Sequence, residues 1–154
     1  MTDFKKDLLF MASALELAKE ASRLGEVPVG AVVTFNNEII GEGLNAPIST
    51  NDPSHHAEVA AIRQAAKSLS NYRLPGTTLY VTLEPCTMCF GLLVHARIRR
   101  VVYGADEPRA GVLTSKLQLP DETFYNHSIQ IEGGLMADES KQLLQSFFKA
   151  QRAR

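Results

Sequence analysis

Residues 54–69, SHHAEVAAIRQAAKSL, and residues 77–89, TTLYVTLEPCTMC, decide the fold that this sequence predicts. From His56, the first stretch carries apolar residues at steps of three and four, which is the spacing of a helix with one buried face. The second stretch begins as a buried strand, and Pro85 then favours the start of another helix over about residues 86–95. Helix, strand and helix in succession are typical of α/β proteins.

The flanking segments continue this alternation. Strands at residues 27–35 and 38–45 are expected to form a hairpin through Asn36 and Asn37, which tolerate the left-handed backbone of a tight turn. The predicted class is therefore α/β, with three layers (α/β/α) and a mixed five-stranded sheet. The other expected elements are helices at about residues 5–24 and 136–151 and strands at 100–105 and 129–134. The residues of the last helix expected to face inward are Leu143, Leu144, Phe147 and Phe148, although which of the two phenylalanines belongs to the core, and which offers a surface for base stacking, stays open.

The composition is that of an ordinary globular protein. The chain has 154 residues, of which 45% are hydrophobic and 21% charged, and its formal net charge is -1. This length predicts a single domain, residues 1–154, with its own hydrophobic core. The net charge excludes a general polycation that binds nucleic acid, although a local basic face remains open. We find no signal peptide, no run of roughly 20 apolar residues and no disulfide framework, so we expect a cytosolic location without membrane contact.

Two short motifs stand where the two helices of the quoted stretches begin. His56 and Glu58 form H-x-E at the first start, while Cys86 and Cys89 follow Pro85 as P-C-x-x-C at the second. A helix N-terminus offers free N–H groups and the positive end of the helix dipole, which stabilise thiolates. One histidine and two cysteines would bind zinc and leave one of its four positions open, as in catalytic sites. Glu58 would then be free to shuttle protons.

Each motif alone has a simpler interpretation. A C-x-x-C that opens a helix after a strand also occurs in thioredoxin-like redox pairs, and a His-x-Glu at a helix start is commonly capping chemistry. Together, the two motifs match the H-x-E…P-C-x-x-C signature of zinc-dependent deaminases. His56 is preferred to His55 by the H-x-E spacing alone. A structural zinc module remains an alternative, which would need His55, His95 or His127 as a fourth ligand and would leave Glu58 without a role.

Segments outside these motifs extend the pattern over most of the chain. They are EVPVGAVV (26–33), GEGLN (41–45), NDPSHHAE (51–58), NYRL (71–74), TLYVTLEPCTMC (78–89), HARIRRVVYGA (95–105) and NHSIQIEGG (126–134). With these segments the sequence resembles the tRNA-specific adenosine deaminases of bacteria, which have a cytidine-deaminase-like fold. The similarity covers about residues 15–148.

This resemblance implies hydrolytic deamination of adenosine to inosine at the wobble position of a tRNA anticodon. It also implies one Zn²⁺ per subunit, a homodimer, and the tRNA anticodon stem-loop as partner, whereas DNA binding is not expected. The residues that it assigns are His56, Cys86 and Cys89 as metal ligands, Glu58 as proton shuttle, and Asn45, Val29 and Ala57 as substrate-binding residues.

One segment departs from the family pattern. Residues 107–115 read EPRAGVLTS, where family members commonly show D-P-K-A-G-A-x-G-S. Thr114 replaces a glycine, and this replacement could change the loop backbone because only glycine takes positive φ freely. The resemblance makes this loop a contact for the anticodon nucleotides, so the choice of substrate could differ. The expected RNA contacts are Glu107, Arg109, Arg152 and Arg154.

Basic residues leave two further questions open. Arg97, Arg99 and Arg100 stand together in the sequence, and such clusters are either phosphate contacts or ordinary solvated surface. The competing function is a zinc-dependent deaminase of a free nucleobase or nucleoside, of the guanine or cytosine type. That enzyme would use the same zinc ligands and the same Glu58.

Overall fold

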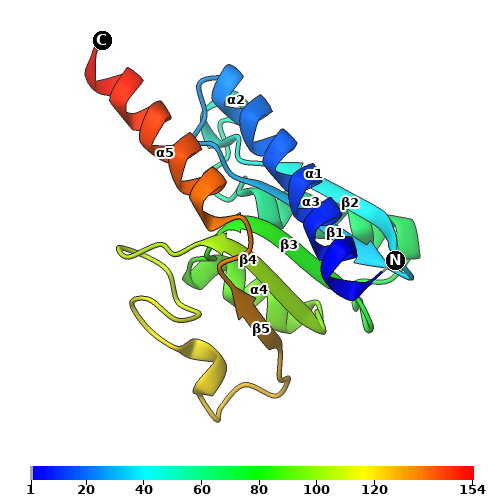
Figure 1. The fold of residues 1–154 in the computed structure, drawn as a ribbon. Helices are drawn as coiled ribbons and strands as arrows, with labels where there is room; N and C mark the ends of the chain where they lie inside the picture. Colours follow the sequence, from blue (N-terminus) through cyan, green and yellow to red (C-terminus); the bar gives the residue numbers. More distant parts are fainter. Residues whose placement is uncertain (1) are drawn as a thin grey trace.

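The structure is a computed structural model that describes residues 2–154. A five-stranded sheet with the order β2-β1-β3-β4-β5 forms its middle layer (Figure 1). The first three strands in this order pair antiparallel, whereas β3, β4 and β5 run parallel, so the sheet is mixed as predicted. The strands are β1 (Gly30–Phe35), β2 (Glu38–Leu44), β3 (Thr78–Leu83), β4 (Arg100–Ala105) and β5 (Gln130–Gly133).

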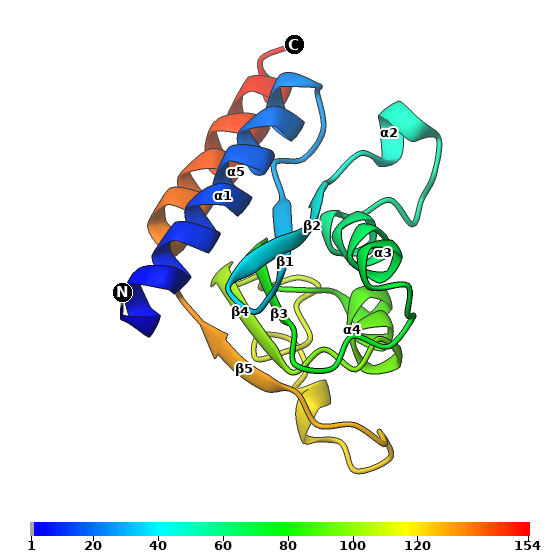
Figure 2. The same ribbon diagram turned by 90° about the vertical axis from the view of Figure 1, so that its right-hand side faces the viewer.

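Helices cover both faces of this sheet (Figure 2). On one face lie α1 (Asp3–Arg23) and α5 (Ala137–Arg152), and on the other lie α3 (Ala57–Leu69) and α4 (Thr87–His95). The connections contain the short α2 (Pro47–Thr50) and one 3₁₀ turn, Leu119–Asp121. Within residues 2–154, no helix combines the length and the apolar character that crossing a bilayer requires.

Most expected elements are found within one to three residues of their predicted bounds. Asn36 and Asn37 form the hairpin turn with φ of 50° and 62°, the left-handed conformation that was expected. Of the two phenylalanines of α5, Phe147 is partly buried, whereas Phe148 does not face inward as expected, since it is 44% exposed. Leu143 packs against the core beneath α1, whereas Phe148 lines a groove beside the loop after β4. The physical reason is that α5 packs against β4, β3 and α1 with one side, and the side chain of Phe148 lies outside that contact.

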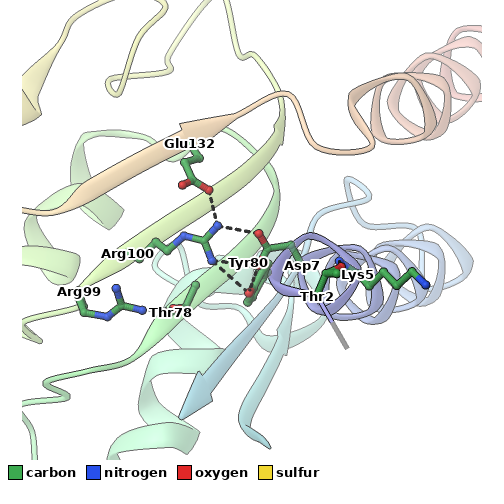
Figure 3. Close-up of polar contacts among 8 residues, drawn as sticks. All are labelled: Thr2, Lys5, Asp7, Thr78, Tyr80, Arg99, Arg100 and Glu132. Carbon is green, nitrogen blue, oxygen red and sulfur yellow. Dashed lines mark hydrogen bonds and ion pairs between the residues drawn. The ribbon is translucent and has the colours of Figure 1, made fainter. Parts of the chain in front are cut away.

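An ion-pair network ties the start of α1 to three strands (Figure 3). The Arg100 guanidinium donates to both carboxylate oxygens of Asp7, at 2.9 and 2.7 Å, and also to Glu132 on β5. The Tyr80 hydroxyl donates to Asp7 from β3. The hydrogen bond from Arg100 is the main reason that the pKa of Asp7 is lowered. The charge of Arg100 is therefore neutralised inside the fold.

Two glycines allow α3 to lie unusually close to the sheet. A methyl group at Gly43 would stand 2.2 Å from the carbonyl oxygen of Ala57, and one at Gly41 would stand 2.1 Å from that of Ala61. Both obstacles are helix backbone, which cannot move aside as the end of a flexible side chain would. Because Gly41 and Gly43 on β2 have no side chains, the start of α3, with His56 and Glu58, can lie directly against this strand.

We predict that Gly43→Ala destabilises the protein by about 1–3 kcal/mol, the usual effect of overpacking a well-filled interior. Gly91→Ala in α4 is the matched control, because nothing lies within 4 Å of the added methyl group. That change should be neutral or raise stability by up to about 1 kcal/mol, because alanine is the better helix former. Urea unfolding of both variants measures the difference, and equal stabilities would contradict the close approach of α3.

Candidate metal centre and active site

Three potential metal ligands meet where β3 ends and two helices begin. His56 is the N-cap residue of α3, Cys86 is the N-cap residue of α4, and Cys89 lies in the first turn of α4. The Nδ1 atom of His56 is 3.6 Å from Sγ of Cys86 and 3.5 Å from Sγ of Cys89. The structure thus brings together the residues of the two sequence motifs, from positions 30 and 33 residues apart.

The geometry and the donor set of this cluster suit zinc. In a tetrahedral site with Zn–N and Zn–S bonds of about 2.0 and 2.3 Å, the nitrogen and sulfur ligand atoms lie about 3.6 Å apart. The observed separations match this value, and all three donor atoms lie within 4.8 Å of one another. Among residues 2–154, no fourth histidine, cysteine or carboxylate joins the cluster. The three ligands therefore leave one position of a tetrahedral ion open.

The hydrogen bond between the two thiols shifts their pKa values in opposite directions. A hydrogen bond from Cys89 is the main cause that lowers the pKa of Cys86 to about 4, and His56 contributes in the same direction. The same bond, together with burial, raises the pKa of Cys89. The hydrogen bond to Cys86 also raises the pKa of His56. Cys86 is therefore a thiolate at neutral pH, which is the form that binds metal.

Glu58 lies next to these ligands without joining them. It is the second residue of α3, its exposed fraction is 4%, and it is absent from the group of ligand atoms. Burial is the main reason that its pKa is raised, and the nearby Cys86 adds to the effect. A buried carboxyl group with a raised pKa is suited to accept and return a proton near neutral pH.

Backbone hydrogen bonds place the expected substrate-binding residues beside this cluster. The Asn45 N–H donates to the Val29 carbonyl at 3.0 Å, and the next residue, Ala46, donates to the carbonyl of His55. The start of β1 and the end of β2 are thereby joined to the segment that carries His56. Ala57 is completely buried, so its side chain offers a substrate no accessible surface. The substrate roles of all three residues remain predictions.

Comparison with known proteins adds to this geometry. A model of the MafB19-like deaminase family matches residues 5–152. The tRNA-specific adenosine deaminase of Haemophilus influenzae is 47% identical over 147 residues, which cover 95% of this chain and 85% of that protein. The chain belongs to the tRNA-specific adenosine deaminase family.

Solved structures agree with this assignment. A structure from a study of tRNA:A34 deaminases that edit adenosine to inosine at the wobble position is 41% identical. It superposes with a TM-score of 0.85 and covers 88% of this chain and 98% of its own. The guanine deaminase of Nitrosomonas europaea has a TM-score of 0.76 but only 24% identity, over 91% of this chain and 83% of its own. That second likeness shows the shared fold alone.

Glu84, which the sequence motifs did not single out, organises the loop in which this member departs from its family. Its carboxylate is 3% exposed and accepts hydrogen bonds from the backbone N–H groups of Glu107, Leu113, Thr114 and Ser115. The Ser115 hydroxyl donates to it as well. Burial acts to raise the pKa of Glu84, but these hydrogen bonds outweigh it and lower the pKa. The only sequence signal was an acid at the end of an otherwise uncharged buried strand.

The substituted loop keeps a regular backbone around this carboxylate. Thr114 is not among the residues with positive φ, so its backbone conformation does not require a glycine. The Thr114 hydroxyl instead makes a 2.6 Å hydrogen bond with that of Tyr103. Gly111 is needed for another reason, because a methyl group there would lie 2.4 Å from the Glu84 carboxylate. Whether the loop backbone differs from that of relatives with a glycine at this position remains a prediction.

Three of the four expected RNA contacts line one groove. Glu107 and Arg109 from the loop face Arg152 from α5 across a hollow of about 700 Å³, which Phe148 also lines. Arg154 follows at the exposed end of the chain. The arrangement combines arginines with an exposed aromatic ring, as in surfaces that bind single-stranded RNA. The contacts themselves remain predictions.

We predict that Glu84→Gln loosens residues 107–115 and lowers the free energy of unfolding by about 2–3 kcal/mol, because buried donors lose their acceptor. Hydrogen exchange should show faster exchange at the amides of Leu113, Thr114 and Ser115, while α3 stays protected. Glu122→Gln, at an exposed position beyond the same loop, is the matched control and should change neither quantity. Unaltered exchange in Glu84→Gln would refute the role given to this carboxylate.

The lowered pKa of Glu84 also determines the pH range in which this carboxylate stabilises the loop. A carboxyl group with a depressed folded-state pKa stabilises the fold fully above its unfolded value, here near 4.5, and that contribution disappears as the pH falls through the lower folded value. The loss of loop protection on acidification should therefore be present in the unmodified protein and absent in Glu84→Gln.

Proposed function

We propose that this chain deaminates adenosine to inosine at the wobble position of a tRNA anticodon. The observation that carries the proposal is an open three-ligand site with a free, buried glutamate beside it, in a chain that belongs to the tRNA-specific adenosine deaminases. The structure of a tRNA:A34 deaminase superposes on this chain over 88% of the chain's length.

His56, Cys86 and Cys89 would hold one Zn²⁺. Their separations and their one-nitrogen, two-sulfur donor set fit this ion. When bound, zinc lowers the pKa of a water molecule to about 7 and so supplies a nucleophile at neutral pH. Glu58, the second residue of α3, lies next to these ligands without being one of them and would be free to exchange protons with that water.

Glu58 would carry the protons of the reaction. Its carboxylate accepts a proton from the water that attacks C6 of adenine and delivers that proton to ring atom N1. It then passes the second proton of the water to the departing amino group, so that adenosine and water give inosine and ammonia. Burial raises the pKa of Glu58, which makes the carboxylate a better proton acceptor than an exposed one.

Recognition of the substrate would involve two regions: residues beside the metal ligands, and the groove between the loop after β4 and α5. Val29 and Asn45, joined by a backbone hydrogen bond beside the His55–His56 segment, would contact the extruded base. Glu107, Arg109, Arg152 and Arg154 would contact the anticodon loop, whose unstacked nucleotides are the easiest to draw into a pocket. A homodimer and a cytoplasmic location belong to the same proposal.

We predict that the purified zinc-loaded protein forms inosine in an anticodon stem-loop with adenosine at the wobble position, and leaves free adenine, adenosine, guanine and cytosine unchanged. Glu58→Gln should lower the turnover number by roughly 100- to 10,000-fold, because the proton carrier is lost, while zinc content stays at one per chain. Glu42→Gln, an exposed carboxylate on neighbouring β2, is the control and should retain activity.

Two results would contradict this proposal. If the protein deaminates a free base but not the stem-loop, the proposed substrate is wrong, although the assignment of the metal ligands stands. Near-normal turnover by Glu58→Gln would remove the mechanism.

A further inference from the structure

A second basic surface lies at the far end of α4 from the metal ligands. Arg73, Arg97, Arg99 and His127 line a groove of about 460 Å³, together with Pro75, Gly76 and Ser128. These residues come from three separate segments: the turn before β3, the turn between α4 and β4, and the loop before β5. No acidic residue is among those that line the groove, although the chain as a whole has a net charge of -1.

The three arginines of this groove keep their charge available. Within residues 2–154, none of them forms an ion pair with a carboxylate. Figure 3 shows the contrast with the next residue in the sequence: Arg100 is bound between Asp7 and Glu132, whereas Arg99 has only a weak 3.4 Å contact with the Thr78 hydroxyl. The Arg73 guanidinium stacks over the ring of Tyr72 and is exposed.

The groove is built on a rigid turn. Arg97 has a φ of 59°, a left-handed conformation that is costly for a residue with a side chain. Its side chain donates to the carbonyl of Val94 at 2.6 Å, and the His127 ring bonds the carbonyl of Ile98 at 2.8 Å. The side chains of Arg97 and His127 are thus fixed by the fold in the groove that Arg99 also lines.

We propose that this groove binds phosphate groups of the RNA outside the deaminated loop. Like charges gathered without counter-charges favour an anion, and guanidinium groups bind phosphate oxygens in pairs. The nine residues of α4 separate the groove from Cys86 by about 14 Å. A nucleotide at the metal site and a phosphate in the groove are therefore different parts of the substrate. This inference rests on the proposed RNA substrate, and it adds the stem backbone to the recognised surface.

The test compares two charge-matched variants of the full chain. One combines Arg73→Gln, Arg97→Gln and Arg99→Gln. The control combines Lys5→Gln, Lys19→Gln and Arg23→Gln on the exposed side of α1, and it removes the same charge elsewhere. The affinities for whole tRNA and for the anticodon stem-loop are measured between about 50 and 200 mM salt, and inosine formation is measured at saturating stem-loop.

The groove variant should show a slope of log affinity against log salt that is shallower by about 2–3, close to one unit for each lost phosphate contact. Over a fourfold change in salt, this difference corresponds to roughly 16- to 64-fold in affinity. The control should keep the slope of the unmodified protein, and the turnover number at saturating RNA should change in neither variant. If the groove variant loses more affinity for whole tRNA than for the stem-loop, the groove also contacts phosphates beyond the anticodon stem.

Identical slopes for the groove variant and the control would overturn this inference, even if the protein makes inosine. A groove variant that changes the oligomeric state but not RNA affinity would also overturn it, because the arginines would then serve a protein contact. An unmodified protein that makes no inosine refutes the proposed reaction separately, since the binding comparison does not depend on turnover.

Discussion

The convergence of two helix starts at one end of β3 is the constraint on which the candidate site depends. Donor atoms from α3 and α4 must lie within 4.8 Å of one another, so both helices must be set on the sheet with little tolerance. β3 lies in the middle of the sheet and leads almost directly into Cys86, while glycines on β2 let α3 approach until its backbone touches the strand. Misplacing either helix by an ångström or more would separate the ligands.

Three buried glutamates show how environment assigns different roles to one side chain. Glu26 accepts hydrogen bonds from Ile48 and Ser49, and Glu84 accepts five from the loop after β4. In both, burial acts to raise the pKa, but the hydrogen bonds prevail and lower it, so these carboxylates stay ionised and order the loops. For Glu58, burial prevails and the pKa is raised. Of these three carboxyl groups, only Glu58 has its protonated form favoured by its surroundings, as a residue that takes up and returns protons requires.

Local patterns in the sequence predicted most of the fold and the ligand cluster. Apolar periodicity located α3, the Asn36–Asn37 pair located the hairpin, and the spacing of His56, Cys86 and Cys89 indicated one site. Features that depend on distant contacts were missed. Glu84 bonds residues 23 to 31 positions away, and the groove of Arg73, Arg97 and Arg99 forms only when separate turns meet. The exposure of Phe148 depends on which side of α5 packs against β4, β3 and α1, which periodicity alone does not encode.

The most direct test of the central claim is a crystal structure of the zinc-loaded protein with anomalous data at the zinc absorption edge. We predict one anomalous peak per chain, from a zinc ion bound by Nδ1 of His56 and the two cysteine Sγ atoms. A single non-protein oxygen should complete the coordination and lie within hydrogen-bond reach of the Glu58 carboxylate. A fourth ligand from the protein, or direct coordination by Glu58, would close the open position and contradict the account of this site as catalytic.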